Sequence, residues 1–331
     1  MNLHRRLEIF SAIGRYIQSD DEALVEAKNQ ASRMNSWFTP EYIDLSLKNI
    51  AEFMLQPSLL DVFSAQYGLP PTQETPKTVG LVMAGNIPMV GFHDMLCTFL
   101  SGHRQRVKLS SKDEVLLKHL IQWAETAYPE LKGWIQFDDM LKGCDAYIAT
   151  GSDNTARYFE QYFQKYPNII RKNRTSVAIL TGNETDEILS LLADDIQLYF
   201  GLGCRNVTQI LVPEGYDFVP ILKALRKYDG YKDHAKYRHN FDYQLTIAIM
   251  NNQFYMTNDS IVLIEHESPF SPIGQLNYRF YTSAEQIQSM LNLEKIQCLV
   301  GEGYTPFGMA QQPTLTDYAD GIDTMSFLSK L

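Results

Sequence analysis

The sequence has few of the features that assign a function directly. Its 331 residues include four cysteines, which form no CxxC pair and no zinc-ligand spacing. Basic residues are not in excess: the formal net charge is −10, which argues against a nucleic-acid partner because phosphate binding needs a basic surface. No apolar run approaches the roughly 20 residues that a membrane span needs. We therefore expect a cytoplasmic protein with reduced thiols, no metal site and no membrane span.

Several common motifs are also missing. The two usual phosphate loops, GxGxxG and GxxxxGK[ST], do not occur, and neither do HExxH and GxSxG. The N-terminal segment MNLHRRLEIF has basic residues without a long apolar core after them, so it predicts an amphipathic helix rather than a signal peptide. What is present is an ordinary globular composition, with 45% apolar and 21% charged residues.

The order of apolar segments predicts an α/β fold. Residues 1–70 have helical spacing, and Thr39 followed by Pro40 is typical of a helix start. From residue 78 onward short apolar runs alternate with helical stretches, which predicts a parallel sheet with helices on both faces. In the last third, QLTIAIM (244–250) is an expected strand, and Ser283 with Gln286 fits a capping box.

Four polar segments fall at the ends of expected strands or helices. They are AGNIP (84–88), VKLSSKD (107–113), ATGSDN (149–154) and FGLGCRN (200–206). Parallel sheets bind ligands at the carboxyl ends of their strands. These segments are therefore the candidate site.

The same segments carry a resemblance to a known family. MAGNIPMVGFHDMLCTFLSGHRQRVKLSSKD is similar to the nucleotide-binding segment of the aldehyde dehydrogenase superfamily, ATGS to its TGS turn, and GLGC to its GQxC segment around the catalytic cysteine. FGMAQQPTLTDYADGIDTMSFL resembles the acyl-CoA reductase branch, which includes the fatty-acid reductase of bacterial luminescence. The resemblance covers residues 76–331 and implies a Rossmann-like nucleotide-binding domain followed by an α/β catalytic domain.

Cys204 is the candidate nucleophile. A thiolate attacks a thioester carbonyl and leaves a new thioester on the protein, and the adjacent Arg205 can favour the thiolate electrostatically. Cys204 follows two glycines at a break between helix and strand, where a side chain can reach a cleft. The alternative is a buried, inert cysteine, which is our interpretation of Cys97, Cys144 and Cys298.

Asn86 and Gly85 are the candidates at the first strand end. The Asn86 amide can donate to the oxyanion that forms when a carbonyl is attacked, and Gly85 lets the backbone pass close to a nicotinamide. The alternative for Asn86 is an N-cap of the helix that we expect to begin near Pro88. The resemblance favours the oxyanion role.

The resemblance also implies the residues that bind the cofactor. Lys108 matches the lysine that binds the adenosine ribose, and Ser111 stands where NAD-preferring relatives often have a glutamate. Since a serine beside Lys112 can donate hydrogen bonds to a 2′-phosphate, we expect NADPH to be the cofactor. The segment Thr150, Gly151 and Ser152 can donate to the pyrophosphate at a helix start. The alternatives are a solvated lysine and an ordinary capped turn.

Two further comparisons with the superfamily bear on the reaction. Glu267 resembles the glutamate that contacts the nicotinamide ribose, although the spacing is off by one, Glu265 is a rival, and a surface glutamate is the alternative. The glutamate that activates water in aldehyde-oxidising relatives has no counterpart in RKNRTSVAI (171–179). An enzyme that hydrolyses the acyl-enzyme needs that base, so its absence favours reduction. The basic residues of this segment either attract CoA phosphates or form a solvated turn.

Taken with the resemblance, these residues predict an enzyme that reduces an acyl-CoA to an aldehyde with NADPH through an S-acyl cysteine. The alternatives are an NAD(P)-dependent aldehyde dehydrogenase and a non-catalytic nucleotide-binding protein of the same fold. We expect N-terminal helices with the nucleotide-binding domain over residues 1–180, and the catalytic domain with a C-terminal tail over 181–331. A homo-oligomer and a partner enzyme that supplies acyl groups are compatible with the resemblance.

Overall fold

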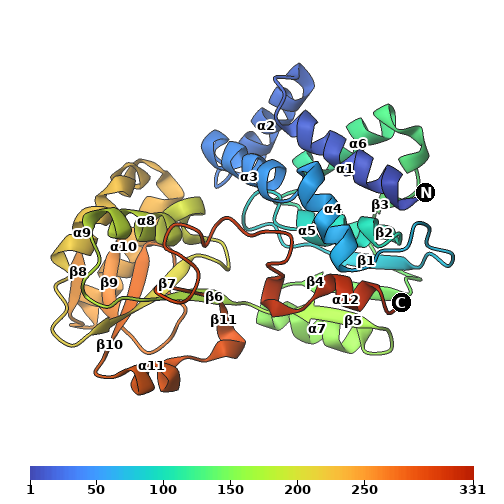
Figure 1. Cartoon of the computed structure of the whole chain (residues 1–331). Helices are drawn as coiled ribbons and strands as arrows, with labels where there is room; N and C mark the ends of the chain where they lie inside the picture. Colours follow the sequence, from blue (N-terminus) through green and yellow to red (C-terminus); the bar gives the residue numbers. More distant parts are fainter. The chain divides into compact units, whose positions relative to one another are not determined.

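The computed structural model describes all 331 residues and divides the chain into two compact units (Figure 1). Unit 1 comprises Met1–Asn173 and Pro313–Leu331, and unit 2 comprises Arg174–Gln312. This division differs from the expected 1–180 and 181–331 in two ways. The chain leaves unit 1 directly after its last strand, and the C-terminal tail returns to unit 1, where Met325 and Leu328 are buried in the core. None of the helices combines the length and apolar character that a membrane span requires.

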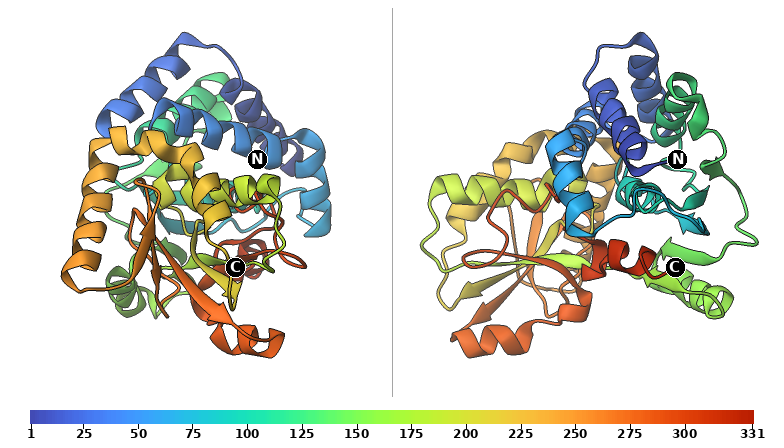
Figure 2. Two further views of the ribbon diagram at one scale, coloured as in Figure 1. Left: turned by 90° about the vertical axis from the view of Figure 1, so that its left-hand side faces the viewer. Right: turned by 45° about the vertical axis from the view of Figure 1, so that its right-hand side comes forward.

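Unit 1 is built on a five-stranded parallel sheet in the order β3-β2-β1-β4-β5. The strands β1 and β4 in the middle of the sheet are short and largely buried, as in sheets covered on both faces. The four N-terminal helices gather on the side of α5 and α6, and α7 lies on the other side of the sheet (Figure 2). The elements of unit 1 are α1 (Leu3–Ile17), α2 (Glu22–Met34), α3 (Pro40–Phe53), α4 (Pro57–Gln66), β1 (Thr78–Val82), α5 (Phe92–Leu100), β2 (Arg104–Lys108), α6 (Val115–Ala127), β3 (Ile135–Phe137), β4 (Ala146–Thr150), α7 (Asp153–Phe163), β5 (Asn168–Arg171) and α12 (Thr324–Leu328).

Local sequence signals fix the ends of these helices. The Thr39 hydroxyl accepts the Tyr42 N–H at 3.3 Å, and Pro40 is the first residue of α3, as the sequence predicted. α5 ends before Gly102, whose φ of 86° lies in the left-handed region. The predicted helical region over residues 1–70 is confirmed as four helices that share one apolar core with the sheet.

Unit 2 contains a six-stranded sheet in the order β11-β6-β7-β10-β9-β8, parallel except for the edge strand β8. One face carries the core formed with α8 and α9, and the other is covered by α11 through Ile287. The predicted capping box is present, since the Ser283 hydroxyl accepts the Gln286 N–H at 3.3 Å. The elements of unit 2 are β6 (Thr175–Ile179), α8 (Asp186–Gln197), β7 (Val207–Pro213), α9 (Val219–Leu225), α10 (Ala235–Met250), β8 (Tyr255–Thr257), β9 (Val262–Glu265), β10 (Gln275–Tyr281), α11 (Ala284–Met290) and β11 (Ile296–Val300).

The strand predicted for QLTIAIM is wrong. Residues 244–250 form the last two turns of α10, which is capped by His234. The buried side chains of this helix are Tyr237, Phe241 and Ala248, which recur at helical spacing. A seven-residue apolar run does not by itself distinguish a strand from a helix. Here the helical register that Tyr237 and Phe241 set earlier in α10 makes residues 244–250 helical.

Candidate active site

The predicted residues of unit 1 meet at the carboxyl edge of its sheet. β1, β2 and β4 are neighbours, and Val82 is level with Lys108 of β2 and Ala149 of β4. The chain runs from β1 to β2 and β3 on one side and then crosses back to β4 and β5 on the other. The sheet therefore has a topological switch point between β1 and β4. Ligands of open α/β sheets bind at such a point. Gly85, Asn86 and the segment 150–152 flank it.

Asn86 lies on the loop between β1 and α5 and is exposed, whereas the other residues of this loop are buried or half-buried. The helix begins only at Phe92, with Gly91 as its N-cap residue, so the N-cap interpretation of Asn86 is wrong. Gly85 is buried, and a Cβ at this position would lie 2.6 Å from Ser110 Cβ. Packing against the loop that follows β2 is therefore enough to require glycine at 85, whether or not a cofactor approaches.

The end of β2 presents two polar side chains to solvent. Lys108 is its last residue and is exposed, and its carbonyl accepts the Met83 N–H at 3.0 Å. Ser111 follows in an exposed turn. An accessible ammonium and hydroxyl suit the ribose and phosphate of a dinucleotide, so this donor set fits the cofactor that the sequence resemblance predicts.

The segment after β4 forms the start of α7. The Ser152 hydroxyl accepts the Thr155 N–H at 3.3 Å, so Ser152 caps the helix as the alternative interpretation expected. Gly151 donates its N–H to the Arg171 carbonyl at 3.2 Å. The remaining N–H groups of the first turn and the Thr150 hydroxyl stand at the helix start, where backbone dipoles favour an anion.

Cys204 lies in unit 2, in a tight turn directly before β7, and is half-buried. Its carbonyl accepts the Ser176 hydroxyl at 3.1 Å. Asn206 closes the turn from inside: its Oδ1 accepts the Gly203 N–H at 2.8 Å, and its own N–H donates to the Gly203 carbonyl at 3.1 Å. The sulfur is thus carried by a rigid, buried turn and not by a flexible loop.

The end of α8 holds this turn in place. Asn206 Nδ2 donates to the carbonyls of Asp195 at 3.2 Å, Ile196 at 3.2 Å and Leu198 at 2.9 Å. The intervening chain passes through three successive left-handed residues, with φ of 56° at Tyr199, 59° at Phe200 and 73° at Gly201. Left-handed non-glycine residues cost energy and cluster at functional sites.

Arg205 makes a structural hydrogen bond beside the Cys204 turn. Its Nε donates to the Ala310 carbonyl at 2.6 Å, and its charge lowers the pKa of Asp195. The Asp195 carboxylate accepts the N–H groups of Gly308 at 2.6 Å and Ala310 at 3.0 Å. Burial outweighs these interactions and raises the pKa of Asp195 to about 6. Arg205 and Asp195 together fasten residues 308–310 to the Cys204 turn.

Two of the other three cysteines are more deeply buried than Cys204. Cys97 and Cys144 are buried, and desolvation raises the pKa of both thiols, well above the usual range for Cys97. This agrees with the inert interpretation. Cys298 is half-buried on β11, as Cys204 is on its turn, so the interpretation of Cys298 as a buried cysteine is wrong. Its sulfur lies 3.0 Å from the Ser176 hydroxyl.

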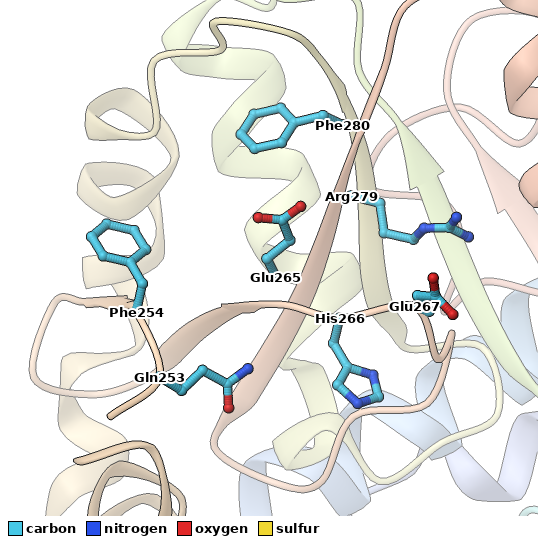
Figure 3. Close-up of a pocket in the computed structure, with 7 residues that line it drawn as sticks. All are labelled: Gln253, Phe254, Glu265, His266, Glu267, Arg279 and Phe280. Carbon is cyan, nitrogen blue, oxygen red and sulfur yellow. The ribbon is translucent and has the colours of Figure 1, made fainter. Parts of the chain in front are cut away.

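Glu267 lines a hollow of about 670 Å³ in unit 2. The other lining residues are Gln253, Phe254, Glu265, His266, Arg279 and Phe280. Glu267 and Arg279 extend to one side of β10, and Glu265 and Phe254 lie on the other (Figure 3). The two candidate glutamates therefore occupy different sides of the strand.

A buried amide and a hydroxyl fasten the loop of Glu267 to β7. Gln209 Nε2 donates to the carbonyls of His266 at 3.0 Å and Ser268 at 3.0 Å, and the Thr208 hydroxyl donates to the Pro269 carbonyl at 2.5 Å. The loop is thus attached to the first residues of the strand that Cys204 precedes. The sequence analysis missed Gln209, although a glutamine within an apolar strand was a visible signal.

The basic segment after β5 is structural. Arg171 is buried, forms an ion pair with Asp94 and donates to the Thr324 hydroxyl at 2.8 Å. Lys172 pairs with Glu160 at 2.8 Å, and Arg174 donates to the Ile296 carbonyl at 3.2 Å. For Arg171 the expectations of a phosphate site and of a solvated turn are both wrong, because its charge is used inside unit 1.

Comparison with known proteins gives the fold. No family model matches the chain, and no curated protein matches it. Solved structures do match. An aldehyde dehydrogenase from Mycobacterium tuberculosis complexed with NAD⁺ shares 13% identity at a TM-score of 0.64, covering 88% of this chain and 71% of that one. Succinic semialdehyde dehydrogenase from Streptococcus pyogenes in complex with NADP⁺ shares 14% identity at a TM-score of 0.63. The match covers 88% of this chain and 74% of that one.

An NAD⁺ complex of aldehyde dehydrogenase from Bacillus cereus shares 12% identity at a TM-score of 0.64, covering 91% of this chain and 72% of that one. Because these identities are low, the likeness concerns the fold. It extends over most of the chain, including strands and helices of both units. The prediction of an α/β fold with a Rossmann-like and a catalytic domain is confirmed: the chain has the aldehyde dehydrogenase fold.

Proposed function

We propose that the protein reduces an acyl-CoA to an aldehyde with NADPH through an S-acyl intermediate on Cys204. The observation that carries the proposal is the Cys204 turn: it presents a half-buried thiol on a rigid, hydrogen-bonded turn within the aldehyde dehydrogenase fold. The two fully buried cysteines have raised pKa values and are poor nucleophiles.

The chain's own residues perform the first half of the reaction. The Cys204 thiolate attacks the thioester carbonyl, and the Asn86 amide donates to the oxyanion that develops. The carbonyl then re-forms as the bond to the CoA sulfur breaks, which leaves CoA thiolate and an acyl group on Cys204. Because the leaving group is itself a thiol, no strong acid is needed to expel it.

Lys108, Ser111 and the start of α7 would hold NADPH, which supplies the hydride when bound. Ser111 and Lys112 support the choice of NADPH, since a hydroxyl and an ammonium donate hydrogen bonds to a 2′-phosphate that a carboxylate would repel. In total, acyl-CoA, NADPH and one proton give aldehyde, CoA and NADP⁺.

The absence of a water-activating carboxylate in residues 171–179 supports reduction over aldehyde oxidation. Arg171 and Arg174 offer no base for hydrolysis, because the guanidinium group stays protonated. An aldehyde dehydrogenase would instead release a free acid.

The test is to incubate the protein with acyl-CoAs and NADPH and to follow NADPH oxidation, free CoA and trapped aldehyde together. We expect all three to change in a one-to-one ratio, and no signal from the C204A variant. Formation of free acid from an aldehyde and NADP⁺, without acyl-CoA reduction, would replace the proposal with the dehydrogenase alternative. No reaction in either direction would favour a non-catalytic nucleotide-binding protein.

A further inference from the structure

The solvent side of α10 is apolar in the second half of the helix. Tyr243, Ile247 and Met250 are spaced i, i+4 and i+7, so they share one face of the helix. Phe254 follows about one turn later, directly before β8. The exposed fractions are 62% for Tyr243, 37% for Ile247, 73% for Met250 and 72% for Phe254. These four side chains are called the α10 patch below.

The α10 patch lies on the opposite side of the helix from the residues that anchor it in unit 2. Those anchors are Tyr237, Phe241 and Ala248, which are buried. A surface helix ordinarily has polar or charged residues on its outer face, whereas a helix that is apolar all round is buried all round. The second half of α10 has the composition of a buried helix and an exposed outer face, so its sequence indicates a further contact.

The surface around the α10 patch carries no charge. No charged residue and no histidine occurs between Asp242 and Asp259, a stretch that includes the end of α10 and all of β8. β8 is an edge strand that pairs only with β9, so no strand lies along its outer edge. The charges of α10 lie in its first half, where Arg238 pairs with Asp242 at 3.0 Å. An uncharged centre with charges at its margin is typical of a protein–protein interface.

The size of the α10 patch also fits such an interface. If each side chain has a full area of about 200 Å², the exposed fractions amount to about 500 Å² of apolar surface, which is near the upper limit for a monomeric protein. A stable complex buries about 800 Å² on each partner. The patch is large enough to form the apolar centre of that area, and the outer edge of β8 adjoins it.

The charge of the chain favours a second copy as the occupant. Each copy has a net charge of −10, so two copies repel each other where their charged faces meet. Over residues 243–258 two copies can approach without bringing like charges together. An apolar patch is complementary to itself and can face itself across a two-fold axis. An anionic membrane surface would require basic residues, which this stretch lacks.

We propose that two copies of the chain form a dimer in which the α10 patch of one copy packs on the α10 patch of the other, about a two-fold axis. The proposal does not depend on the function proposed for Cys204. Each residue of a two-fold interface occurs on both sides of it, so one substitution changes the contact twice.

The mass of the full-length protein in solution tests the proposal, measured by light scattering and sedimentation over a range of protein concentrations. We expect a mass of two chains for wild type, and a dimer dissociation constant at least about 100-fold higher for M250K, because two ammonium groups would face each other in an apolar contact. M250K makes the net charge less negative, so weaker association could not be attributed to general repulsion. The matched control is V62K on α4, where Val62 is also exposed, and it should remain a dimer.

Three outcomes of these measurements would overturn the proposal. The first is a mass of one chain for wild type at every concentration. The second is a dimer that M250K leaves intact, which would place the interface on another face. The third is a monomeric wild type that binds uncharged phosphatidylcholine vesicles when M250K does not, which would assign the α10 patch to a lipid surface.

A crosslinking experiment keeps the proposal testable if M250K does not fold. p-Benzoylphenylalanine in place of Phe254 retains an aromatic side chain at an exposed position. Irradiation of a mixture of isotope-labelled and unlabelled chains identifies crosslinks between two copies. We expect these crosslinks to map to residues 243–258 of the second copy. Crosslinks that map only outside α10 and β8, or no crosslinks between copies, would overturn the proposal.

Discussion

Gly203 and Asn206 bond to each other twice across the turn that carries Cys204. The Gly203 N–H donates to Asn206 Oδ1 at 2.8 Å, and the Asn206 N–H donates to the Gly203 carbonyl at 3.1 Å. The same asparagine also satisfies three carbonyls at the end of α8. One buried side chain thus connects the candidate nucleophile to the core of unit 2.

Replacement of Asn206 should therefore destabilise the protein and misplace Cys204. In N206A one N–H and three carbonyls lose a buried partner, so we expect the free energy of unfolding to fall by about 2–4 kcal/mol. N206D keeps the acceptor for Gly203 but loses the three donated bonds, and it should be nearly as destabilised. Urea denaturation measures both variants, with N251A on the exposed end of α10 as the control. A change below about 0.5 kcal/mol in N206A would contradict the role assigned to the turn.

Asp195 predicts a pH dependence of stability. Its pKa is about 6 in the folded protein, above the ordinary value of 3.8, because burial disfavours the charge. The folded state therefore binds the proton more tightly than the unfolded state. The stabilisation from this group is complete below about pH 4 and is lost as the pH rises through about 6, a loss of about 3 kcal/mol.

The variant D195N does not titrate and isolates this effect from other groups. We expect the difference in unfolding free energy between wild type and D195N to shift against wild type as the pH rises from about 4 to about 7. Denaturation curves at several pH values measure it. A difference that is independent of pH would mean that Asp195 titrates at its ordinary value in the folded protein.

Ser111 predicts the preference for the cofactor. In S111E a carboxylate would face the 2′-phosphate, so we expect the KM for NADPH to rise about tenfold or more, with a smaller effect on NADH. The neutral variant S111Q has a similar length and should change both values little. Steady-state kinetics with the two cofactors distinguish these outcomes. If S111E raised the KM for NADPH and the KM for NADH equally, residue 111 would not face the 2′-phosphate.

The four thiols should differ in reactivity. Cys97 and Cys144 are buried with raised pKa values, so we expect an alkylating reagent to leave them unmodified in the folded protein. Cys204 and Cys298 are half-buried and should react, and all four should react in denaturant. Peptide mapping after brief exposure to the reagent gives the order in which the four thiols are modified. Rapid modification of Cys97 in native protein would contradict the packing of α5.

Much of the fold could be predicted because its signals are local. The alternation of short apolar runs and helical stretches gave the parallel sheet of unit 1, and Thr39, Pro40 and Ser283 marked helix starts that the structure confirms. The helix over residues 244–250 escaped prediction because its register depends on residues earlier in α10. The return of the tail to unit 1 depends on long-range burial of Met325 and Leu328.

The polar framework of the site could not be predicted in the same way. Asn206, Asp195 and Gln209 are buried, but in a single sequence a buried polar residue looks like an exposed one until its partners are known. Arg171 shows the same limit, since its sequence context suggested a basic turn and its partner Asp94 lies 77 residues away. The sequence could suggest Cys204 as the candidate nucleophile, but it could not show that Asn206 holds the turn on which Cys204 lies.

The most direct measurement is the intact mass of the protein after incubation with acyl-CoAs of several chain lengths in the absence of NADPH, followed by peptide mapping. We predict a single acyl adduct that maps to Cys204 and is missing from C204A. An adduct on Cys97 or Cys298, or none at any chain length, would contradict the proposed function.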